Sequence, residues 1–158
     1  MKIHIAKSDE EILSCFPVMR ELRPQLDEDS FVARVRALEQ SGYLLAYLQE
    51  SEGPVAVAGF RLGGSLAWGR FLYVDDLVTR SSHRSRGFGS AFLSWLREFA
   101  EKQGCDQLHL DSGVQRKEAH RFYEREGLLL ASYHFAKRVA PNTALNPTGV
   151  PLRSTPAS

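Results

Sequence analysis

The spacing of apolar residues changes at Gly42, and the change separates two kinds of predicted element. Before Gly42, Ser8 is followed three residues on by Glu11, which is typical of a helix start with a hydroxyl cap. Further on, Phe31 and Val35 belong to an apolar stripe with the spacing of another helix. The pattern therefore predicts a short strand and two helices, over about residues 2–6, 8–22 and 27–41.

After Gly42 the pattern becomes typical of strands. Two short runs rich in β-forming residues, 43–48 and 55–62, are separated by turn formers, which predicts an antiparallel hairpin. A longer run over residues 67–79 mixes strong strand formers with two adjacent carboxylates. Such a pair is out of place in an ordinary strand, so this run is a candidate for function.

The second half of the chain alternates helices and strands. Apolar residues recur at helical spacing from Gly87 to Gly104, and this helix has the clearest pattern in the chain. A strand, a helix and two final strands follow, over residues 105–111, 118–126, 128–130 and 133–139. The order is βααβββαβαββ, which predicts an α+β (mixed α/β) fold with a central, mostly antiparallel twisted sheet flanked by helices.

Composition restricts the class of protein. The 158 residues fit one domain, and a net charge of +1 gives no global field for nucleic acid or a membrane surface. The apolar runs are too short to cross a bilayer and the N-terminus does not resemble a signal peptide, so we expect a cytoplasmic protein. Cys15 and Cys105 lack the spacing of a metal site or disulfide framework, so we expect reduced thiols and no metal.

The end of the chain has a different composition from the rest. Residues 140–158 are rich in Pro, Ser, Thr and Asn and poor in apolar residues. We therefore expect one domain over residues 1–139, followed by a Pro-rich C-terminal tail. The tail would be mobile or would form an arm laid on a neighbouring copy, which would make the protein a homodimer.

The segment Arg84-Ser-Arg-Gly-Phe-Gly-Ser90 opens the clearest helix directly after a strand. A helix N-terminus has unpaired N–H groups and a partial positive charge, which favour an anion. Gly87 and Gly89 let the backbone approach a ligand, and Arg84 and Arg86 add charge at the rim. We interpret the segment as a turn that binds a pyrophosphate; the alternative is a glycine-rich loop with solvated arginines.

Two other phosphate-binding motifs fit this segment less well. A P-loop requires a Lys soon after its last glycine, and none follows Gly89 closely. The dinucleotide motif G-x-G-x-x-G needs a small residue where the chain has Phe92, and it belongs in a βαβ series rather than after hairpins. Asp111 ends the next strand at about the distance where that motif has an acidic residue, so this alternative stays open.

These features resemble the GNAT superfamily of acetyl-CoA-dependent N-acetyltransferases, most strongly over residues 68–139. In that family a Q/R-x-x-G-x-G/A segment binds the coenzyme A pyrophosphate, and it matches Arg84, Gly87 and Gly89. A second signature, A-x-x-F-Y-x-x-x-G, matches Ala119-His-Arg-Phe-Tyr-Glu-Arg-Glu-Gly127. The resemblance implies that acetyl-CoA is the cosubstrate and that it lies where two strands splay apart.

The resemblance also implies which residues contact acetyl-CoA. The strand before the turn would lie beside the pantetheine arm and contribute mainly its backbone. Many relatives have Asn three residues before the alanine of the second signature, where this chain has Arg116. The expected set is Leu77, Val78, Thr79, Arg84, Ser85, Arg86, Gly87, Phe88, Gly89, Ser90, Arg116 and Ala119.

Acyl transfer from a thioester to an amine needs a route for the amine proton and an acid for the departing thiolate. Tyr123 matches the tyrosine that serves as this acid in similar enzymes; the alternative is a packed core tyrosine. Asp75 lies four residues before Thr79, where several similar enzymes have the base. Unless a β-bulge intervenes, alternation puts Asp75 on the side of Leu77 and Asp76 on the other, so Asp75 ranks first as base.

The acidic pair has two further interpretations. The carboxylates, Asp76 in particular, could bind a cationic amine, and their strand resembles that of polyamine acetyltransferases. Alternatively, they cap a strand edge or pair with Arg61 or Arg70. Asp111 and Ser112, at the end of the next strand, are the other candidates for substrate contact.

The sequence thus predicts an N-acetyltransferase that moves an acetyl group from acetyl-CoA to a primary amine of a small molecule or protein. No cysteine is expected near the cleft, which favours direct transfer over an acetyl-enzyme. The alternative is a non-catalytic sensor or interaction domain of the same fold that binds CoA or acyl-CoA.

Overall fold

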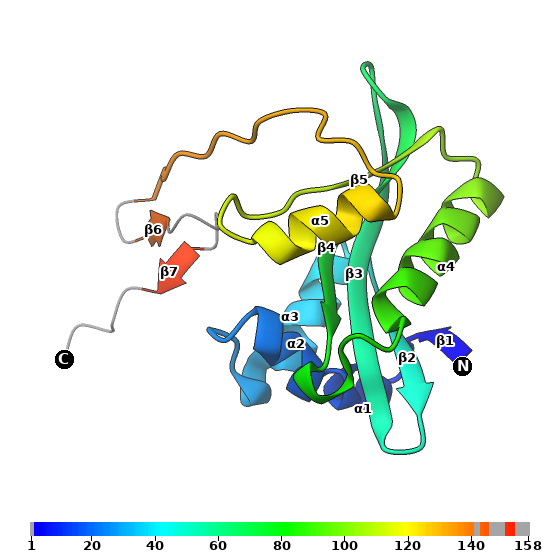
Figure 1. Ribbon diagram of the computed structural model, residues 1–158. Coiled ribbons are helices and arrows are strands. Elements are labelled where there is room, and N and C mark those ends of the chain that lie inside the picture. The colour runs from blue at the N-terminus through cyan, green and yellow to red at the C-terminus, as the bar shows by residue number, and fades with distance from the viewer. Residues whose placement is uncertain (1, 141–142, 146–150, 154–158) are drawn as a thin grey trace. The chain divides into compact units, whose positions relative to one another are not determined.

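The computed structural model describes residues 2–140, 143–145 and 151–153. The chain divides into two compact units, residues 1–110 and 111–158. The first unit contains a five-stranded sheet with helices packed on both faces (Figure 1). The second contains helix α5 and a two-stranded sheet. None of the described helices is long and apolar enough to span a membrane.

The predicted capping box starts helix α1 (Asp9–Ser14). Ser8 Oγ accepts a hydrogen bond from the N–H of Glu11 at 3.1 Å, and Glu11 Oε2 accepts from the N–H of Ser8 at 2.8 Å. The same carboxylate also accepts from the N–H of Lys7 and the hydroxyl of Tyr47. These hydrogen bonds, those from the backbone above all, lower the pKa of Glu11 to about 2. One carboxylate therefore fixes how the chain enters the helix.

The helix predicted over residues 8–22 is interrupted at Cys15. This residue ends α1, and α2 (Phe16–Leu22) begins directly after it with Pro17 in its first turn. Proline has no N–H, and a first-turn N–H has no acceptor inside the helix, so a new helix starting here loses no bond. The prediction of one continuous helix is therefore wrong, whereas α3 (Glu28–Glu39) is confirmed.

Five strands form one sheet in the order β1-β2-β3-β4-β5. Neighbouring strands are antiparallel except β4 and β5, which are parallel, so the mostly antiparallel sheet is confirmed. β2 and β3 form the hairpin that the sequence predicts. The strands are β1 (Lys2–Ile5), β2 (Tyr43–Glu50), β3 (Gly53–Ser65), β4 (Gly69–Thr79) and β5 (Gln107–Leu110).

The two faces of the sheet bury different apolar clusters. Helices α1 to α3, in shades of blue in Figure 1, share a core with strand residues such as Val57 and Val78. The other face is covered by α4 (Phe88–Lys102), drawn in green. There Phe60 is fully buried, and its ring centroid lies 5.4 Å from that of Phe99. Each strand between these layers must therefore be apolar on both sides, as the run over residues 55–60 is.

The second unit differs from the prediction in where its strands lie. Helix α5 (Lys117–Arg125) agrees with the predicted helix. Residues 128–140 contain no strand, so the two strands predicted there are wrong. Their apolar side chains are exposed, Phe135 to 90%, because no neighbouring strand pairs with them. Strands β6 (Thr143–Leu145) and β7 (Pro151–Arg153) pair with each other instead, inside the predicted tail; the remainder of that tail lies outside the described residues.

Candidate active site

Strand β4 extends beyond its neighbour β5, which leaves part of one edge open. The pairing with β5 ends where Val74 lies opposite Leu110, whereas the pairing with β3 continues to Thr79. In the part of the chain that the structure describes, no strand pairs with residues 75–79 on the β5 side. N–H and C=O groups on an open strand edge can bond an extended ligand. The expected separation of the two strands is therefore present.

The residues predicted beside the pantetheine arm occupy this open edge. Val78 is buried in the core shared with α1 to α3, and the side chains of Leu77 and Thr79 are half-buried. Since side chains alternate along a strand, Leu77 and Thr79 point to the face opposite Val78. The backbone N–H and C=O groups of residues 77–79, rather than their side chains, therefore face the open edge where a ligand could bind.

The turn after β4 leads into α4. The N–H of Arg80 donates to a carbonyl of β3 at 2.8 Å, and the short 3-10 helix η1 (Ser81–His83) then carries the chain out of the sheet. Arg84 and Arg86 are exposed, as expected of charges at the rim of a site. Phe88 is buried and anchors the first turn of α4.

Two residues of this turn adopt a left-handed backbone. Ser85 has φ 64°, and Gly87, the N-cap of α4, has φ 82°. The space where a Cβ on Gly87 would lie is open, so glycine is required there for the conformation and not for packing. Left-handed residues in a turn aim successive N–H groups toward a common point, which is the geometry of an anion-binding concavity.

Among the residues that the structure describes, no side chain caps the start of α4. The N–H of Ala91 donates to the carbonyl oxygen of Gly87 at 3.0 Å, so the N–H groups of the preceding turn, including that of Gly89, have no acceptor inside the helix. The helix is 15 residues long, and its dipole adds partial positive charge at this end. The predicted phosphate-binding turn therefore has the geometry that the sequence leads us to expect.

The acidic pair lies on a β-bulge in β4. Val74 lies opposite Phe60 and Asp76 lies opposite the next residue along β3, Gly59. Asp75 is therefore an extra residue without a partner in β3. A bulge of this kind interrupts the alternation of side chains along a strand.

The bulge places both carboxylates on the face of the sheet that packs against α1 to α3. Asp75 Oδ2 accepts from Nε of Arg61 at 2.9 Å, and Asp76 Oδ2 accepts from the hydroxyl of Tyr43 at 2.8 Å. Tyr43 and Arg61 lie opposite each other in β2 and β3, so their side chains share a face. The exception that the sequence analysis left open, a β-bulge, is therefore present, and Asp75 does not lie on the side of Leu77.

Asp76 is held by two donors. Nε of Arg23 donates to its Oδ1 at 2.9 Å and Tyr43 to its Oδ2, and its side chain is only 14% exposed. Arg23 also donates from Nη2 to the carbonyl oxygen of Asp75 at 3.0 Å, which ties down the bulge. Gly59 leaves room for these contacts, because a Cβ there would collide with the Tyr43 hydroxyl. Burial and the nearby carboxylates raise the pKa of Tyr43 well above its usual range, so it donates.

Asp75 is more accessible than Asp76. Its side chain is 27% exposed and accepts a hydrogen bond from Arg61, whose side chain is 36% exposed. Burial raises the pKa of Asp75 above 3.8, and the Arg61 guanidinium opposes that shift. A carboxylate with a raised pKa is a better proton acceptor near neutral pH. Of the two acids, Asp75 is the one with room for a ligand.

The partners of the acids were foreseen only in part. The pairing with Arg61 that the sequence left as an alternative is present. Arg70, the other alternative, instead donates from Nε to the carbonyl oxygen of Gln103 at 2.8 Å. Arg23 and Tyr43 were not predicted. The available signal was that two carboxylates inside a sheet require partners, but it does not say which distant residues supply them.

The second unit contains five of the predicted site residues, which are described by their contacts inside that unit: Asp111, Ser112, Arg116, Ala119 and Tyr123. Arg116 is exposed at the start of α5, and Ala119 and Tyr123 are half-buried on it. The ring of Tyr123 lies 5.4 Å from that of its neighbour Phe122. Burial raises the pKa of Tyr123 above 10, and the charge of Arg116 opposes the shift.

The loop before α5 contains a hydroxyl without a partner. Ser112 Oγ is buried and has no hydrogen-bond partner among the described residues. On its N-terminal side, Asp111 Oδ2 lies 3.3 Å from Nδ1 of His134. Beyond it, the carbonyl oxygen of Gly113 lies 2.7 Å from Nε2 of His120. An unpaired buried hydroxyl is unfavourable unless something bonds it, so Ser112 remains a candidate for ligand contact.

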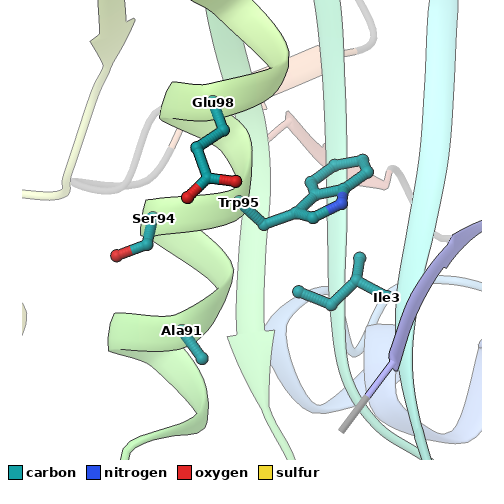
Figure 2. A pocket seen from close by; sticks show the side chains of 5 residues that line it. All are labelled: Ile3, Ala91, Ser94, Trp95 and Glu98. Atoms are coloured by element: carbon teal, nitrogen blue, oxygen red, sulfur yellow. The ribbon is translucent and has the colours of Figure 1, made fainter.

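A hollow also lies at the opposite edge of the sheet, between β1 and α4. Figure 2 shows Ile3 and Trp95 facing each other across it, with Ser94 and Glu98 on α4. It contains neither the β4 edge nor the turn before α4, so it is separate from the candidate site. Among the described residues, no group of His, Cys, Asp or Glu is arranged to hold a metal.

Comparison with known proteins identifies the class. A sequence model of the Acetyltransferase (GNAT) family matches residues 8–128. An uncharacterized N-acetyltransferase of Bacillus subtilis, YhdJ, is 37% identical over 134 residues, 84% of this chain and 94% of the relative. The open β4 edge and the uncapped turn before α4 therefore lie in an acetyltransferase. The chain belongs to the GNAT family.

Two further comparisons are with acetyltransferases whose names state a ligand. An aminoalkylphosphonate N-acetyltransferase of Salmonella typhimurium is 34% identical over 64 residues, 40% of this chain and 42% of that protein. Among solved structures, the aminoglycoside N-acetyltransferase AAC(6')-Iy in complex with CoA superposes with a TM-score of 0.72 at 12% identity. The superposition covers 87% of this chain and 95% of the other, and it shows a shared fold.

Proposed function

We propose that the protein transfers an acetyl group from acetyl-CoA directly to a primary amine of a small molecule or protein. The observation that carries the proposal is the open edge of β4 over residues 75–79, which runs into an uncapped, left-handed turn at the start of α4. This arrangement occurs in a chain of a family of acetyltransferases. An extended edge followed by an anion-binding turn suits a ligand with an amide-containing arm and a pyrophosphate.

The residues of the first unit fit the proposed cosubstrate. Gly87 has open space above it, Gly89 follows in the uncapped first turn, and Arg84 and Arg86 are exposed beside them. These groups would hold the pyrophosphate of acetyl-CoA, while the backbone of β4 over residues 77–79 would hold its pantetheine arm. When bound, acetyl-CoA supplies the acetyl group as a thioester. A solved relative of the same fold was determined with CoA, which supports this assignment.

Asp75 is the proposed general base. From Thr79 back to Asp75, β4 covers about 13 Å at the usual rise per residue. A ligand anchored at the turn and extended along this edge would therefore end near the carboxylate. The raised pKa of Asp75 suits it to take a proton from an ammonium group, directly or through water. Arg61 would keep the carboxylate oriented.

Tyr123 is the proposed general acid, and the assignment rests on the family signature around it. Its pKa, raised by burial, keeps the phenol protonated at neutral pH, as an acid requires. Ser112, with its unpaired hydroxyl, and Asp111 are proposed to contact the acceptor. Direct transfer is supported by Cys15: burial raises the pKa of its thiol to about 12, which makes it a poor nucleophile.

One observation favours the alternative of a non-catalytic domain that binds CoA or acyl-CoA. Both carboxylates of β4 already have partners, Asp75 in Arg61 and Asp76 in Arg23 and Tyr43. If these contacts only stabilise the bulge, the fold would still bind the cosubstrate without using it. Activity therefore separates the two functions.

The test is release of free CoA thiol from acetyl-CoA in the presence of a panel of amines, with acetylated product identified by mass spectrometry. Amine-dependent thiol release supports the transferase. Tight CoA binding by calorimetry without turnover of any amine would instead support the sensor. Recovery of a covalently acetylated enzyme in the absence of amine would contradict direct transfer.

A further inference from the structure

The charged groups around Asp75 form a balanced cluster. Arg23 and Arg61 supply two positive charges, and Asp75 and Asp76 supply two negative ones. An acidic pair without partners would attract a polycation, which is why the sequence suggests polyamine-like acceptors. Here each carboxylate bonds an arginine, so the cluster has no net charge to offer a polycation. The structure therefore argues against recognition by negative charge alone.

The two arginines differ in how much of their bonding capacity is used. Arg23 donates from Nε to Asp76 and from Nη2 to the carbonyl oxygen of Asp75, and its side chain is 27% exposed. Arg61 donates from Nε to Asp75, and its side chain is 36% exposed. Neither Nη group of Arg61 donates to a described residue. An arginine has five N–H donors, so Arg61 keeps most of them for a ligand.

We propose that the acceptor is a small zwitterion whose primary amine lies at Asp75 and whose carboxylate, phosphonate or phosphate is bound by the Nη groups of Arg61. The inference rests on the proposed acetyl transfer and specifies its substrate. A guanidinium binds planar carboxylates and phosphorus oxyanions through paired hydrogen bonds, and such charge-assisted bonds are the strong ones. Arg61 is then the residue that determines specificity.

The geometry also limits the size of the acceptor. Its two charged groups must reach adjacent side chains whose own atoms, Nε of Arg61 and Oδ2 of Asp75, are 2.9 Å apart. The amine and the acid are therefore separated by a short spacer of a few carbons. A protein N-terminus has such an acid group only where its first residue is Asp or Glu, and a polyamine has none. Short amino acids and aminoalkyl phosphonates have both groups.

The position of Arg61 supports access from the proposed site. Arg61 lies opposite Tyr43 on one side and Tyr73 on the other, so its side chain shares the face of Asp75 and Asp76. The groups that face Asp75 in this cluster are the guanidinium ions of Arg23 and Arg61, the carboxylate of Asp76 and the phenol of Tyr43. Of the two cations among them, Arg61 is the more exposed.

The experiment compares acceptors of matched length. Initial rates of thiol release are measured with β-alanine and 2-aminoethylphosphonate, with propylamine and ethanolamine as analogues without the acid, and with putrescine and spermidine as polycations. We expect kcat/KM for the two acid-bearing amines to exceed that for every other probe by about 10-fold or more, the effect of one or two charge-assisted bonds. Equal or higher values for propylamine or spermidine would overturn the inference while leaving acetyl transfer intact. Thiol release with none of the probes or other amines would instead contradict the proposed function.

Arg61→Gln tests the residue itself. The variant is expected to reduce the preference for β-alanine over propylamine by about 10-fold or more, while Arg61→Lys retains part of it. The ratio of the two acceptors is the readout, since loss of the bond to Asp75 affects both alike. Arg70→Gln is the matched control, because Arg70 lies on the neighbouring strand and bonds Gln103 rather than an acid of the site. An unchanged ratio in a folded Arg61→Gln protein would remove Arg61 from recognition of the acceptor.

Discussion

Arg61 donates a hydrogen bond of 2.9 Å from Nε to Oδ2 of Asp75, and this acceptor is the extra residue of the β4 bulge. The bond therefore joins a regular position of β3 to an irregular position of β4. Arg61 lies opposite Tyr73, and Asp75 follows Tyr73 by two residues, so ordinary alternation already puts Asp75 on the face of Arg61. The bulge brings Asp76 to the same face. The bulge is therefore what adds a second carboxylate to the face that carries the ion pair.

Replacement of Asp75 by Asn is expected to lower kcat roughly 100-fold or more, the contribution typical of a general base. In the parent, kcat/KM should rise with pH as Asp75 loses its proton, at a pKa above 3.8. In Asp75→Asn this rise should be absent, since the amide does not titrate. The pH profile of thiol release at saturating acetyl-CoA checks both expectations. An unaltered profile would exclude Asp75 as the base.

The same pKa makes a separate prediction for stability. The folded-state pKa of Asp75 is raised, so the folded protein holds this proton more tightly than the unfolded chain does. The stability associated with the protonated acid is fully present below pH 3.8 and is lost as pH rises through the folded pKa. Urea unfolding should therefore show the Asn variant gaining stability relative to the parent between pH 3.5 and pH 7.

Glu11→Gln is expected to make the free energy of unfolding depend less on pH in the acid range. The pKa of Glu11 is lowered from 4.5 to about 2, so its contribution is present above pH 4.5 and is lost as pH falls toward 2. The variant should lose less stability than the parent across this window, while being less stable at pH 7. Thermal unfolding from pH 7 to pH 2 checks this. Parallel curves for the two proteins would show that the capping carboxylate is not the titrating group.

Gly59→Ala is expected to destabilise the fold by about 1–3 kcal/mol, as overpacking of a buried site does. The new Cβ would collide with the Tyr43 hydroxyl and lie 2.6 Å from Asp76 Oδ2. Denaturant unfolding measures the effect. Gly64→Ala is the control, because the nearest atom to a Cβ there, the carbonyl oxygen of Gly69, is 3.9 Å away. Equal stability of the two variants would contradict the close packing proposed over Gly59.

Gly89→Trp is expected to weaken acetyl-CoA binding far more than it weakens folding, because the indole would cover the first turn of α4 where the pyrophosphate is proposed to lie. Isothermal calorimetry with CoA provides the affinity. Ser94→Trp provides the comparison, since Ser94 is exposed further along the same helix. If Gly89→Trp bound CoA as tightly as the parent, the turn would not hold the pyrophosphate.

Tyr123→Phe is expected to lower kcat by roughly 100-fold, the scale of a lost general acid, with little change in acetyl-CoA affinity. The hydroxyl is the only group removed, and the half-buried ring keeps its packing beside Phe122. Single-turnover kinetics and CoA calorimetry on the same preparation check the two parts. A variant with the parent's rate would place Tyr123 among the structural residues.

The sequence predicts the fold well wherever one local signal decides the outcome. The capping box at Ser8 and Glu11, the hairpin of β2 and β3 and the helix after Gly87 each follow from residues close together in the chain. Predictions fail where a distant partner or one extra residue decides. The strands expected over residues 128–139 had the right composition but no strand to pair with.

In the candidate site, too, features set by neighbouring residues could be predicted and features set by distant residues could not. The turn at residues 84–90 is contiguous, and its left-handed glycine can be anticipated from the motif. The cluster around Asp75 cannot, because its partners come from the end of α2 and from β2 and β3, up to 53 residues away. The bulge at Asp75 breaks the alternation on which the sequence-based placement of the two acids relied. A sequence alone gives no register, so it could not reveal this shift.

The bulge has a consequence for the whole strand. Val74 lies opposite Phe60, whose ring packs on α4, whereas Val78 lies opposite Val57 and belongs to the core under α1 to α3. In an uninterrupted strand two residues four apart would face the same layer. Because of the single inserted residue, the even-numbered side chains of β4 pack toward α4 before Asp75 and toward α1 to α3 after it. Deletion of Asp75 would leave Asp76 directly after Val74 and still opposite Gly59, so regular alternation would keep the far half of the strand on its present faces.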